Sequence, residues 1–392
     1  MRCANPYTPG AGFMPAYLAG REKPLEDAEN YLSSIQLGYP QQSVIYSGLR
    51  GVGKTVLLNA IESEAEEKDI LFEHIEINEN RNFIQQIANT AKKFIHKMSR
   101  KEAAKEAVRK ATGLLRAFTV TYNPADSTFT AGMDGDIPED ISTGILTDDL
   151  TDLFVSMGRT ALKSEDTIIF FIDEIQYMKI NEAEALISAI HRCNQLRLPI
   201  MIFGAGLPKI LKMLGEVKSY SERLFRFEEI GSLEKEDAKA AIVKPAEELK
   251  VSYNEDAVKE IINVTEGYPF FIQEYCKAIW ERAEETIITV EDVYNSRPEF
   301  EKRLDQSFFK VRFERSTKKE KQFMFAMVKC GDLPCTISNV AAIMGKNVKS
   351  ISPYRAQLID KGLIYATAHA EVDFTVQQFD KYLIRINPEL EI

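Results

Sequence analysis

The sequence predicts an α/β fold made of a P-loop core with a parallel sheet, an α-helical lid and a C-terminal winged helix-turn-helix. Three observations lead to this fold class. Apolar β-rich runs alternate with helical patterns in the first part of the chain, which is typical of a parallel sheet. From Lys235 to about Glu284 the periodicity is helical only. After residue 318, three helical segments precede two short strands. The expected domains are the α/β core 1–232, the helical lid 233–298 and the winged helix 299–392.

The composition is that of a globular protein without a membrane-spanning segment. The 392 residues suggest two or three domains, and 45% hydrophobic with 28% charged residues exclude disorder of the whole chain. No stretch approaches the roughly 18 apolar residues of a transmembrane helix, and the first residues lack the apolar stretch of a secretory signal. The five cysteines show no C-x-x-C spacing, so we expect reduced thiols, with neither disulfides nor a zinc site. A cytoplasmic location without a membrane partner is therefore predicted.

The elements of the core are expected in a regular alternation. Strands are predicted where β-branched and aromatic residues cluster between turn formers, and helices where apolar residues follow the helical period. Turn-forming and acidic residues dominate at about 118–147, which predicts a surface insertion. The predicted helices are 23–37, 55–67, one or two within 82–117, 146–162, 181–196 and 207–215, and the predicted strands are 43–47, 70–77, 167–172, 199–203 and 225–230.

A glycine-rich loop follows the first predicted strand and opens a helix. Its sequence, Gly48-Leu49-Arg50-Gly51-Val52-Gly53-Lys54-Thr55, fits the pattern G-x-x-x-x-G-K-[ST] of a phosphate-binding loop, the P-loop. Glycines allow backbone N–H groups to surround phosphates, and the helix N-terminus adds a favourable dipole. We expect Lys54 to reach the β- and γ-phosphates of ATP, and the Thr55 hydroxyl to hold Mg²⁺. Val56, the next residue, joins the nucleotide-binding candidates.

Two acids end the most apolar predicted strand. Asp173 and Glu174 follow the run Ile168-Ile169-Phe170-Phe171-Ile172, which is typical of a central parallel strand. With the P-loop upstream, we expect Asp173 to orient the metal through its water shell. Glu174 is the candidate general base that activates the attacking water. The alternative is that both acids only cap the next helix. Gln176 is interpreted as a solvated helix residue.

Together these motifs resemble the AAA+ superfamily, and more closely the origin-recognition-like ATPases and the STAND signalling ATPases. Leu18-Ala19-Gly20-Arg21-Glu22 resembles the G-R-E box of these families, which implies that Arg21 lies near the nucleotide. Gly267-Tyr268-Pro269 resembles the G-x-P element of STAND proteins, which implies that Gly267 and Pro269 close the lid against the nucleotide. A surface arginine and a purely structural turn are the alternatives. The resemblance extends from Leu18 to Ile386.

Two further comparisons with these families concern hydrolysis. The segment before the last core strand resembles the region where oligomeric AAA+ proteins present an arginine finger, so Arg223 is the candidate and Arg226 the second choice. A salt-bridged surface arginine is the alternative. After strand 199–203 these families place a polar sensor, whereas this sequence has Gly204-Ala205-Gly206. The missing side chain favours a slow switch that holds ATP or ADP over a fast motor.

Basic charge is concentrated near the C-terminus of an acidic chain. The net charge is −10, yet residues 302–361 carry 13 basic and 5 acidic side chains. Winged-helix modules contact phosphates or base edges from their third helix. Pro353 within the third helix counts against this role, because it fits a recognition helix only if that helix starts late. The expected helices are 318–331, 336–344 and 348–361, and the expected strands are 363–367 and 372–376. The nucleic-acid candidates are Lys346, Asn347, Lys349, Ser350 and Arg355.

The leading interpretation is a slow ATPase that acts as a nucleotide-dependent switch and binds double-stranded DNA through the winged helix. A homo-oligomer is compatible with it. The second interpretation is a signalling scaffold whose winged helix packs on the core and whose output is a protein partner. Glu371 and Asp373 in the predicted wing favour the second, because they repel phosphate. A third interpretation is an ATPase that binds ATP and barely hydrolyses it, against which the intact Lys54, Asp173 and Glu174 count.

Overall fold

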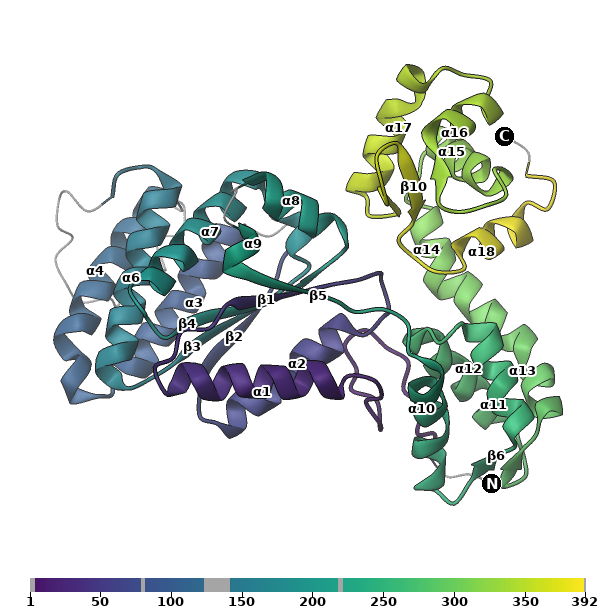
Figure 1. Cartoon of the computed structure of the whole chain (residues 1–392), viewed down its shortest axis with the longest axis horizontal. Coiled ribbons are helices and arrows are strands. Elements are labelled where there is room, and N and C mark those ends of the chain that lie inside the picture. Colours follow the sequence, from purple (N-terminus) through teal and green to yellow (C-terminus); the bar gives the residue numbers. More distant parts are fainter. Residues whose placement is uncertain (1–3, 79–81, 123–141, 218–220, 391–392) are drawn as a thin grey trace.

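The computed structural model describes residues 4–78, 82–122, 142–217 and 221–390. Figure 1 shows three parts: an α/β core, a group of helices beside which the N-terminus lies, and a small C-terminal domain. Most of the insertion expected at 118–147 lies outside the described residues. Helix α4 (Lys105–Tyr122) takes up the start of this range, and helix α6 (Leu146–Ser164) begins at its end.

The core sheet has five strands that run parallel in the order β2-β3-β4-β1-β5. Parallel pairing brings all carboxyl ends to one edge of the sheet, so the loop after β1 and the acids that end β3 share that edge. The predicted fold class is therefore confirmed, and the sheet order places the two motifs close together. The strands are β1 Ser43–Ser47, β2 Leu71–Glu76, β3 Ile168–Asp173, β4 Ile200–Gly206 and β5 Phe225–Glu229.

Helices cover both faces of this sheet, and successive side chains alternate between the faces. Along β3, Ile169 and Phe171 pack in a buried cluster with α1 and α2, whereas Phe170 and Ile172 pack with α3, α4, α6 and α7. Figure 1 shows α1 and α2 on one side of the sheet and α7 and α8 on the other. The remaining core helices are α1 Glu22–Gln36, α2 Lys54–Glu67, α3 Phe83–Met98, α7 Ile180–Gln195, α8 Lys209–Val217 and α9 Ser221–Leu224, with 3₁₀ turns η1 Glu102–Ala104 and η2 Ile175–Tyr177.

The helical part after the core continues without a break into the C-terminal domain. Helix α13 (Val290–Arg303) passes directly into the π-helical turn η3 (Leu304–Phe309) and then into α14 (Lys310–Phe313). By their residue types alone, Ser296-Arg297-Pro298 predict a linker at the boundary between the expected lid and winged helix. This prediction is wrong, because Pro298 lies inside α13. Buried Val293 and Phe300 anchor the helix on either side of the proline. The preceding elements are α10 Lys235–Glu247, β6 Ser252–Tyr253, α11 Glu255–Thr265, α12 Pro269–Arg282 and β7 Ile287–Ile288.

The C-terminal domain has the predicted order of three helices and a hairpin. Helix α17 begins at Val348, as predicted, and contains Pro353, so it accommodates this proline without a late start. Because Pro353 has no N–H, the carbonyl of Lys349 lacks its helical hydrogen bond. Lys349 is exposed, so water can replace this hydrogen bond. A third strand and a final helix, α18, were not predicted. The elements are α15 Lys318–Lys329, β8 Cys335–Thr336, α16 Ile337–Ile343, α17 Val348–Asp360, β9 Ile364–Tyr365, β10 Glu371–Phe374 and α18 Phe379–Ile386.

A buried ion pair holds α15 against the end of α17. The Nζ of Lys361 donates hydrogen bonds of 2.9 and 2.7 Å to the two carboxylate oxygens of Glu320, and the backbone N of Thr317 donates one of 2.6 Å. The Glu320 residue is only 1% exposed. Burial raises the pKa of Glu320, but the hydrogen bonds from Lys361 and Thr317 outweigh burial and hold this pKa below its ordinary value of 4.5.

Replacing Glu320 with glutamine is expected to destabilise the C-terminal domain by about 2 kcal/mol at neutral pH, because Lys361 loses its charged partner. Since the pKa of Glu320 is lower in the folded than in the unfolded chain, the pair stabilises the fold above the unfolded pKa and loses this effect in acid. Hydrogen exchange of the α15 amides at neutral and acidic pH measures the difference. In Glu314→Gln, which breaks an exposed pair with Lys321, the change should stay below about 0.5 kcal/mol. Equal effects of the two substitutions at neutral pH would contradict the assignment.

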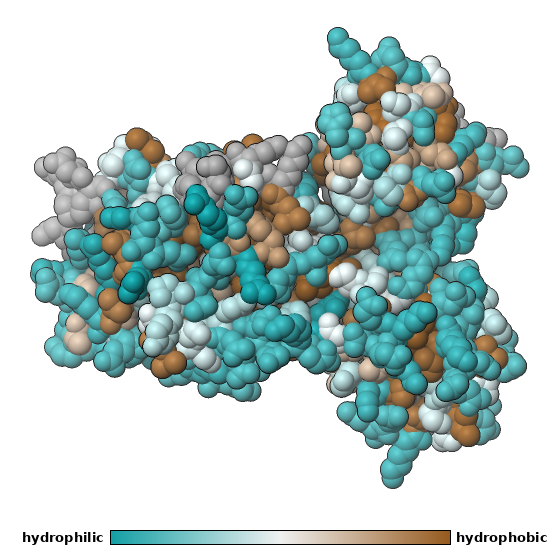
Figure 2. Space-filling model, viewed as in Figure 1, coloured by the Kyte–Doolittle hydropathy of each residue, from teal (hydrophilic) through white to brown (hydrophobic). Residues whose placement is uncertain are grey.

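None of the helices in the described part of the chain has both the length and the apolar character needed to span a bilayer. Figure 2 shows one face of the molecule, on which hydrophilic residues dominate. Hydrophobic residues on this face lie in small separate patches. Scattered apolar residues of this kind are normal for a protein surface.

Candidate active site

The P-loop adopts its turn between β1 and α2 because two of its glycines have left-handed backbones. Gly51 has φ 87° and Gly53 has φ 93°, a conformation that costs other residues energy. Helix α2 then begins at Lys54, so its free N–H groups point toward the loop. The Nζ of Lys54 donates hydrogen bonds of 3.0 and 2.8 Å to the carbonyls of Gly48 and Leu49. Burial lowers the pKa of Lys54 to about 8.

A hydroxyl and a carboxylate meet beside this lysine. The Oγ1 of Thr55 donates a 2.6 Å hydrogen bond to Oδ2 of Asp173, although 118 residues separate them. Mg²⁺ prefers oxygen ligands and is usually bound through one or two protein groups together with phosphates and water. The pair fits such a metal site. Among the described residues, no cluster of three or more His, Cys, Asp or Glu side chains offers another metal site.

The carboxylate of Glu174 is held by two side chains. Its Oε1 lies 3.5 Å from Nη1 of Arg50, and its Oε2 accepts a hydrogen bond from the amide of Gln176. The interpretation of Gln176 as solvated is wrong, since it is 4% exposed. Its Oε1 accepts a 2.9 Å hydrogen bond from the backbone N of Leu207. A β-carbon on Gly206 would lie 2.6 Å from this oxygen, so the glycine where a sensor was expected makes room for the Gln176 amide.

Replacing Gln176 with leucine is expected to lower ATP turnover roughly tenfold to a hundredfold, because Glu174 loses a hydrogen bond that orients it. The affinity for ATP should stay nearly constant, since Gln176 does not line the nucleotide cavity. Steady-state kinetics that separate kcat from KM measure both. Gln195→Ala, at the exposed end of α7, serves as the matched control. A loss of ATP affinity without a loss of turnover would contradict this role.

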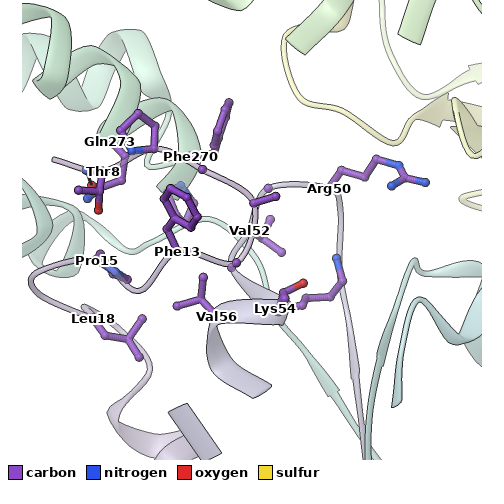
Figure 3. Close-up of a pocket in the computed structure, with 18 of the residues that line it drawn as sticks. Thr8, Phe13, Pro15, Leu18, Arg50, Val52, Lys54, Val56, Phe270 and Gln273 are labelled. Carbon is purple, nitrogen blue, oxygen red and sulfur yellow. Dashed lines mark hydrogen bonds between the residues drawn. The ribbon is translucent and has the colours of Figure 1, made fainter. Parts of the chain in front are cut away.

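A cavity of about 650 Å³ lies beside the P-loop, within the range typical of ligand pockets. Its walls come from the P-loop, from the start of α12 and from an N-terminal segment, residues 8–18, to which the sequence assigned no role. Figure 3 shows Phe13 at the centre of these walls, between Val56 and Phe270. The N-terminal segment is held at its start and near its middle: the N of Thr8 donates to Oε1 of Gln273, and Asn59 Nδ2 donates to the carbonyl of Gly12.

The two motifs from the family resemblance lie at this cavity in different ways. Arg21 lines it, but its guanidinium donates to the backbone carbonyls of Gly20, Val52 and Gly231, at 2.7 to 3.0 Å. It therefore ties the P-loop to the connection between core and lid. Pro269 also lines the cavity at the first position of α12.

Gly267 stands behind the cavity in a turn that packs on the core–lid connection. It has φ 70°, and an added β-carbon would lie 2.4 Å from the carbonyl oxygen of Leu233. The next residue, Tyr268, donates a hydrogen bond from its hydroxyl to the carbonyl of Arg50. The turn therefore contacts both the P-loop and the start of the lid.

The side chain of Arg50 points away from the nucleotide cavity, as Figure 3 shows. Its Nη2 donates a 2.6 Å hydrogen bond to the hydroxyl of Tyr177. Its backbone N donates a 3.1 Å hydrogen bond to the carbonyl of Thr375 in the C-terminal domain. Next to it, a β-carbon on Gly362 would lie 2.9 Å from Nη2 of Arg50. The P-loop is thus in direct contact with the C-terminal domain, an arrangement of the kind that the second interpretation expects.

The remaining candidates lie apart from the cavity. Arg223 is exposed in α9 and does not line the cavity in this single chain. Arg226 pairs with Asp27 and Glu228 within the chain, as its alternative interpretation expects. The nucleic-acid candidates lie at α17, where Asn347 is the N-cap that accepts a hydrogen bond from the N of Ser350. Within the described residues, no carboxylate forms an ion pair with Lys346, Lys349 or Arg355.

A P-loop at the end of β1, a hydroxyl–carboxylate pair and a lid over the cavity define a P-loop nucleotide-binding protein. The family model of the AAA ATPase domain matches residues 17–203, which include both the P-loop and the acids. This part of the chain therefore matches the AAA ATPase domain, in agreement with the resemblance to the AAA+ superfamily. Residues 306–383 match a domain of unknown function, DUF8462. The comparison with curated proteins finds no match for the chain.

Solved structures resemble the chain over nearly its whole length at low sequence identity. A Walker-type ATPase of Pyrococcus abyssi is 13% identical with a TM-score of 0.51, over 93% of this chain and 96% of that one. The chain shares its fold. The Orc1 protein of Aeropyrum pernix in complex with DNA is 15% identical, with a TM-score of 0.46 over 95% and 94%. The RuvB Holliday junction branch migration motor of Thermotoga maritima is 15% identical, with a TM-score of 0.42 over 93% and 95%.

Proposed function

We propose that this protein binds Mg²⁺-ATP in the cavity beside the P-loop and hydrolyses it. The observation that carries this proposal is the hydrogen bond between Thr55 and Asp173 next to the buried ammonium of Lys54. These three groups, brought together from two strand ends, are those that a phosphate–metal site needs. Mg²⁺ would be held by Thr55 and Asp173, and it neutralises the charge that develops on the phosphates when bound.

The other cavity residues have separate tasks in this proposal. Lys54 contacts the β- and γ-phosphates, and Glu174 accepts the proton of the attacking water. The N-terminal segment covers the base, for which the ring of Phe13 offers a face because it is 63% exposed at the cavity. Pro269 positions the start of α12 against the nucleotide, and Arg21 holds the loop in shape.

We propose that turnover is slow. Residues 204–206, where the resembled families place a polar sensor, are Gly-Ala-Gly at the end of β4, so they offer no polar side chain to the γ-phosphate. Arg223 is proposed as the residue that a second copy of the chain supplies, because it is exposed and distant from the cavity of its own chain. Hydrolysis that does not depend on protein concentration would remove Arg223 from this role.

The proposed output is binding of duplex DNA by the C-terminal domain. Support comes from Lys349 and Ser350, which are exposed at the first turn of α17, and from the absence of ion pairs to its basic residues within the described part of the chain. The bound nucleotide would influence this domain through the P-loop, because the backbone N of Arg50 donates a hydrogen bond to the carbonyl of Thr375. A switch of this kind requires that ATP and ADP stabilise the two arrangements differently.

One set of contacts favours a signalling scaffold as the second candidate. The C-terminal domain is tied to the lid turn by Lys381, which pairs with Glu266 at 2.6 Å, and by Gln377. Burial raises the pKa of Glu266, but the hydrogen bonds from Lys381 and Gln377 outweigh burial and lower it. These contacts fit a domain that acts as a clamp and releases a surface for a protein partner.

Fluorescence anisotropy with a labelled DNA duplex, at two salt concentrations and with ATP, ADP or no nucleotide, separates the two candidates. Replacing Lys349 and Arg355 with alanine should weaken binding and reduce the salt slope by about two, as expected for two lost phosphate contacts. The matched control replaces Lys239 and Lys259 of the lid, which should leave the slope unchanged. Lys54→Ala should abolish the nucleotide dependence. Absence of DNA binding at low salt would favour the scaffold.

A further inference from the structure

An arginine of the C-terminal region lines the nucleotide cavity without an acidic partner. Arg312 lies in α14, within the segment that matches DUF8462 and outside the AAA ATPase match. Its contacts are unusual for a half-buried guanidinium: it donates to the carbonyl of Phe308, and no ion pair with a carboxylate is found for it in the described residues. Neither the family resemblance nor the sequence pattern singled out this residue.

The position of Arg312 is fixed by an aromatic stack on the P-loop. Phe308 stacks on Phe270 with ring centroids 4.6 Å apart, and a β-carbon on Gly51 would lie 3.7 Å from the tip of the Phe308 ring. The guanidinium of Arg312, one helical turn later, lies 4.1 Å from the centroid of the Phe308 ring. The π-helical turn η3 directly precedes it, and such turns are frequent at functional sites.

The electrostatic environment of Arg312 is that of a cation without a counterion. Its pKa is lowered to about 10, mainly by burial and next by repulsion from Arg50, while Tyr268 and Glu174 act in the opposite direction. The guanidinium of Arg50 is already engaged by Tyr177 and Glu174. A buried cation without a paired anion is costly, so an anion in the cavity would stabilise it.

We propose that Arg312 binds the terminal phosphate of ATP, so that the C-terminal domain contacts the nucleotide directly. This inference rests on the proposed ATP site. The terminal phosphate is the partner because the Phe308 ring that carries Arg312 lies against Gly51 of the P-loop, and the charges of Arg50 and Glu174 both act on Arg312. Glu174 is the group proposed to act at that phosphate. ADP lacks this phosphate, so Arg312 would contact ATP and not ADP. The position of α14, which carries Arg312, would then depend on which nucleotide is bound.

Isothermal titration calorimetry with a non-hydrolysable ATP analogue and with ADP, each with Mg²⁺, tests this role on the full chain. In Arg312→Ala the affinity for the analogue should fall at least about tenfold, as for one lost charge-assisted hydrogen bond, while the affinity for ADP changes little. Arg312→Lys, which keeps the charge and loses the planar fork, should recover part of the preference. Arg315→Ala, an exposed arginine near Arg312, is the control and should bind both nucleotides as the wild type does.

The outcomes separate this inference from the proposed function. An unchanged ratio of the two affinities in Arg312→Ala, or an equal loss of both, would overturn the inference, because a merely structural arginine affects both nucleotides alike. If Arg312→Ala does not fold, the ratio in Arg312→Gln and Arg312→Lys decides in the same way. A wild-type chain that binds neither nucleotide would instead overturn the proposed ATP site.

Discussion

Replacing Glu174 with glutamine is expected to lower ATP turnover about a thousandfold, the scale of a lost general base. The amide has nearly the same shape as the carboxylate but cannot accept the proton of the attacking water. Binding of Mg²⁺-ATP should persist, because Lys54, Thr55 and Asp173 keep their arrangement. Single-turnover phosphate release measures the chemical step, and calorimetry measures ATP binding.

The control for this experiment is Glu184→Gln, a change of the same chemistry on α7 outside the cavity. It should leave turnover at the wild-type level. Turnover of Glu174→Gln within about threefold of the wild type would remove Glu174 as general base. The scaffold and DNA-binding candidates would both survive that result, because each needs nucleotide binding and neither needs fast hydrolysis.

Replacing Lys54 with alanine is expected to weaken ATP binding about a hundredfold. Hydrogen bonds to charged groups contribute roughly 1.5–3 kcal/mol each, and Lys54 is the group that reaches the phosphates in this proposal. The loss should be specific to the site. Burial lowers the pKa of Lys54, which means that the charged ammonium is less favourable in the folded chain than in water. Removing this charge therefore does not remove a stabilising interaction of the fold. The fold should therefore tolerate its removal, with a melting temperature close to that of the wild type.

The matched control is Lys68→Ala at the other end of helix α2. Lys68 forms a surface pair with Glu29 at 3.4 Å, and such pairs contribute little. Calorimetric titration with ATP and thermal unfolding of both variants give affinity and stability from the same samples. Equal ATP affinities of Lys54→Ala and the wild type would contradict the P-loop assignment and the proposed function with it.

Local patterns in the sequence were sufficient to predict much of the α/β core. The P-loop could be predicted because its geometry depends on contiguous residues: the glycines at 51 and 53 permit left-handed backbones, and Lys54 opens the helix that follows. The strand that ends in Asp173 was recognisable because both of its faces are buried, which makes its sequence continuously apolar. Such features need no knowledge of distant partners.

Some expectations failed where packing outweighs local preference. Pro298 is a helix breaker by its chemistry, yet α13 passes through it because the helix is anchored by buried residues before and after it. Pro353 likewise lies inside a helix, but here the helix was predicted at 348–361, and the unpaired carbonyl is exposed to water. Gln176 was interpreted as solvated because no local pattern shows that the backbone N of Leu207, 31 residues later, donates a hydrogen bond to its amide. The same amide donates to Glu174.

The sequence by itself determined which chemical groups this protein offers to a nucleotide: Lys54, Thr55, Asp173 and Glu174, each at the end of a strand or the start of a helix. Tertiary structure alone decided what surrounds them. Arg50 turns to the C-terminal domain, Arg312 reaches the cavity from more than 250 residues away in the chain, and residues 8–18 form a wall of the cavity. These contacts arise from the packing of three parts of the chain, and no local rule of sequence specifies which distant side chains that packing brings together.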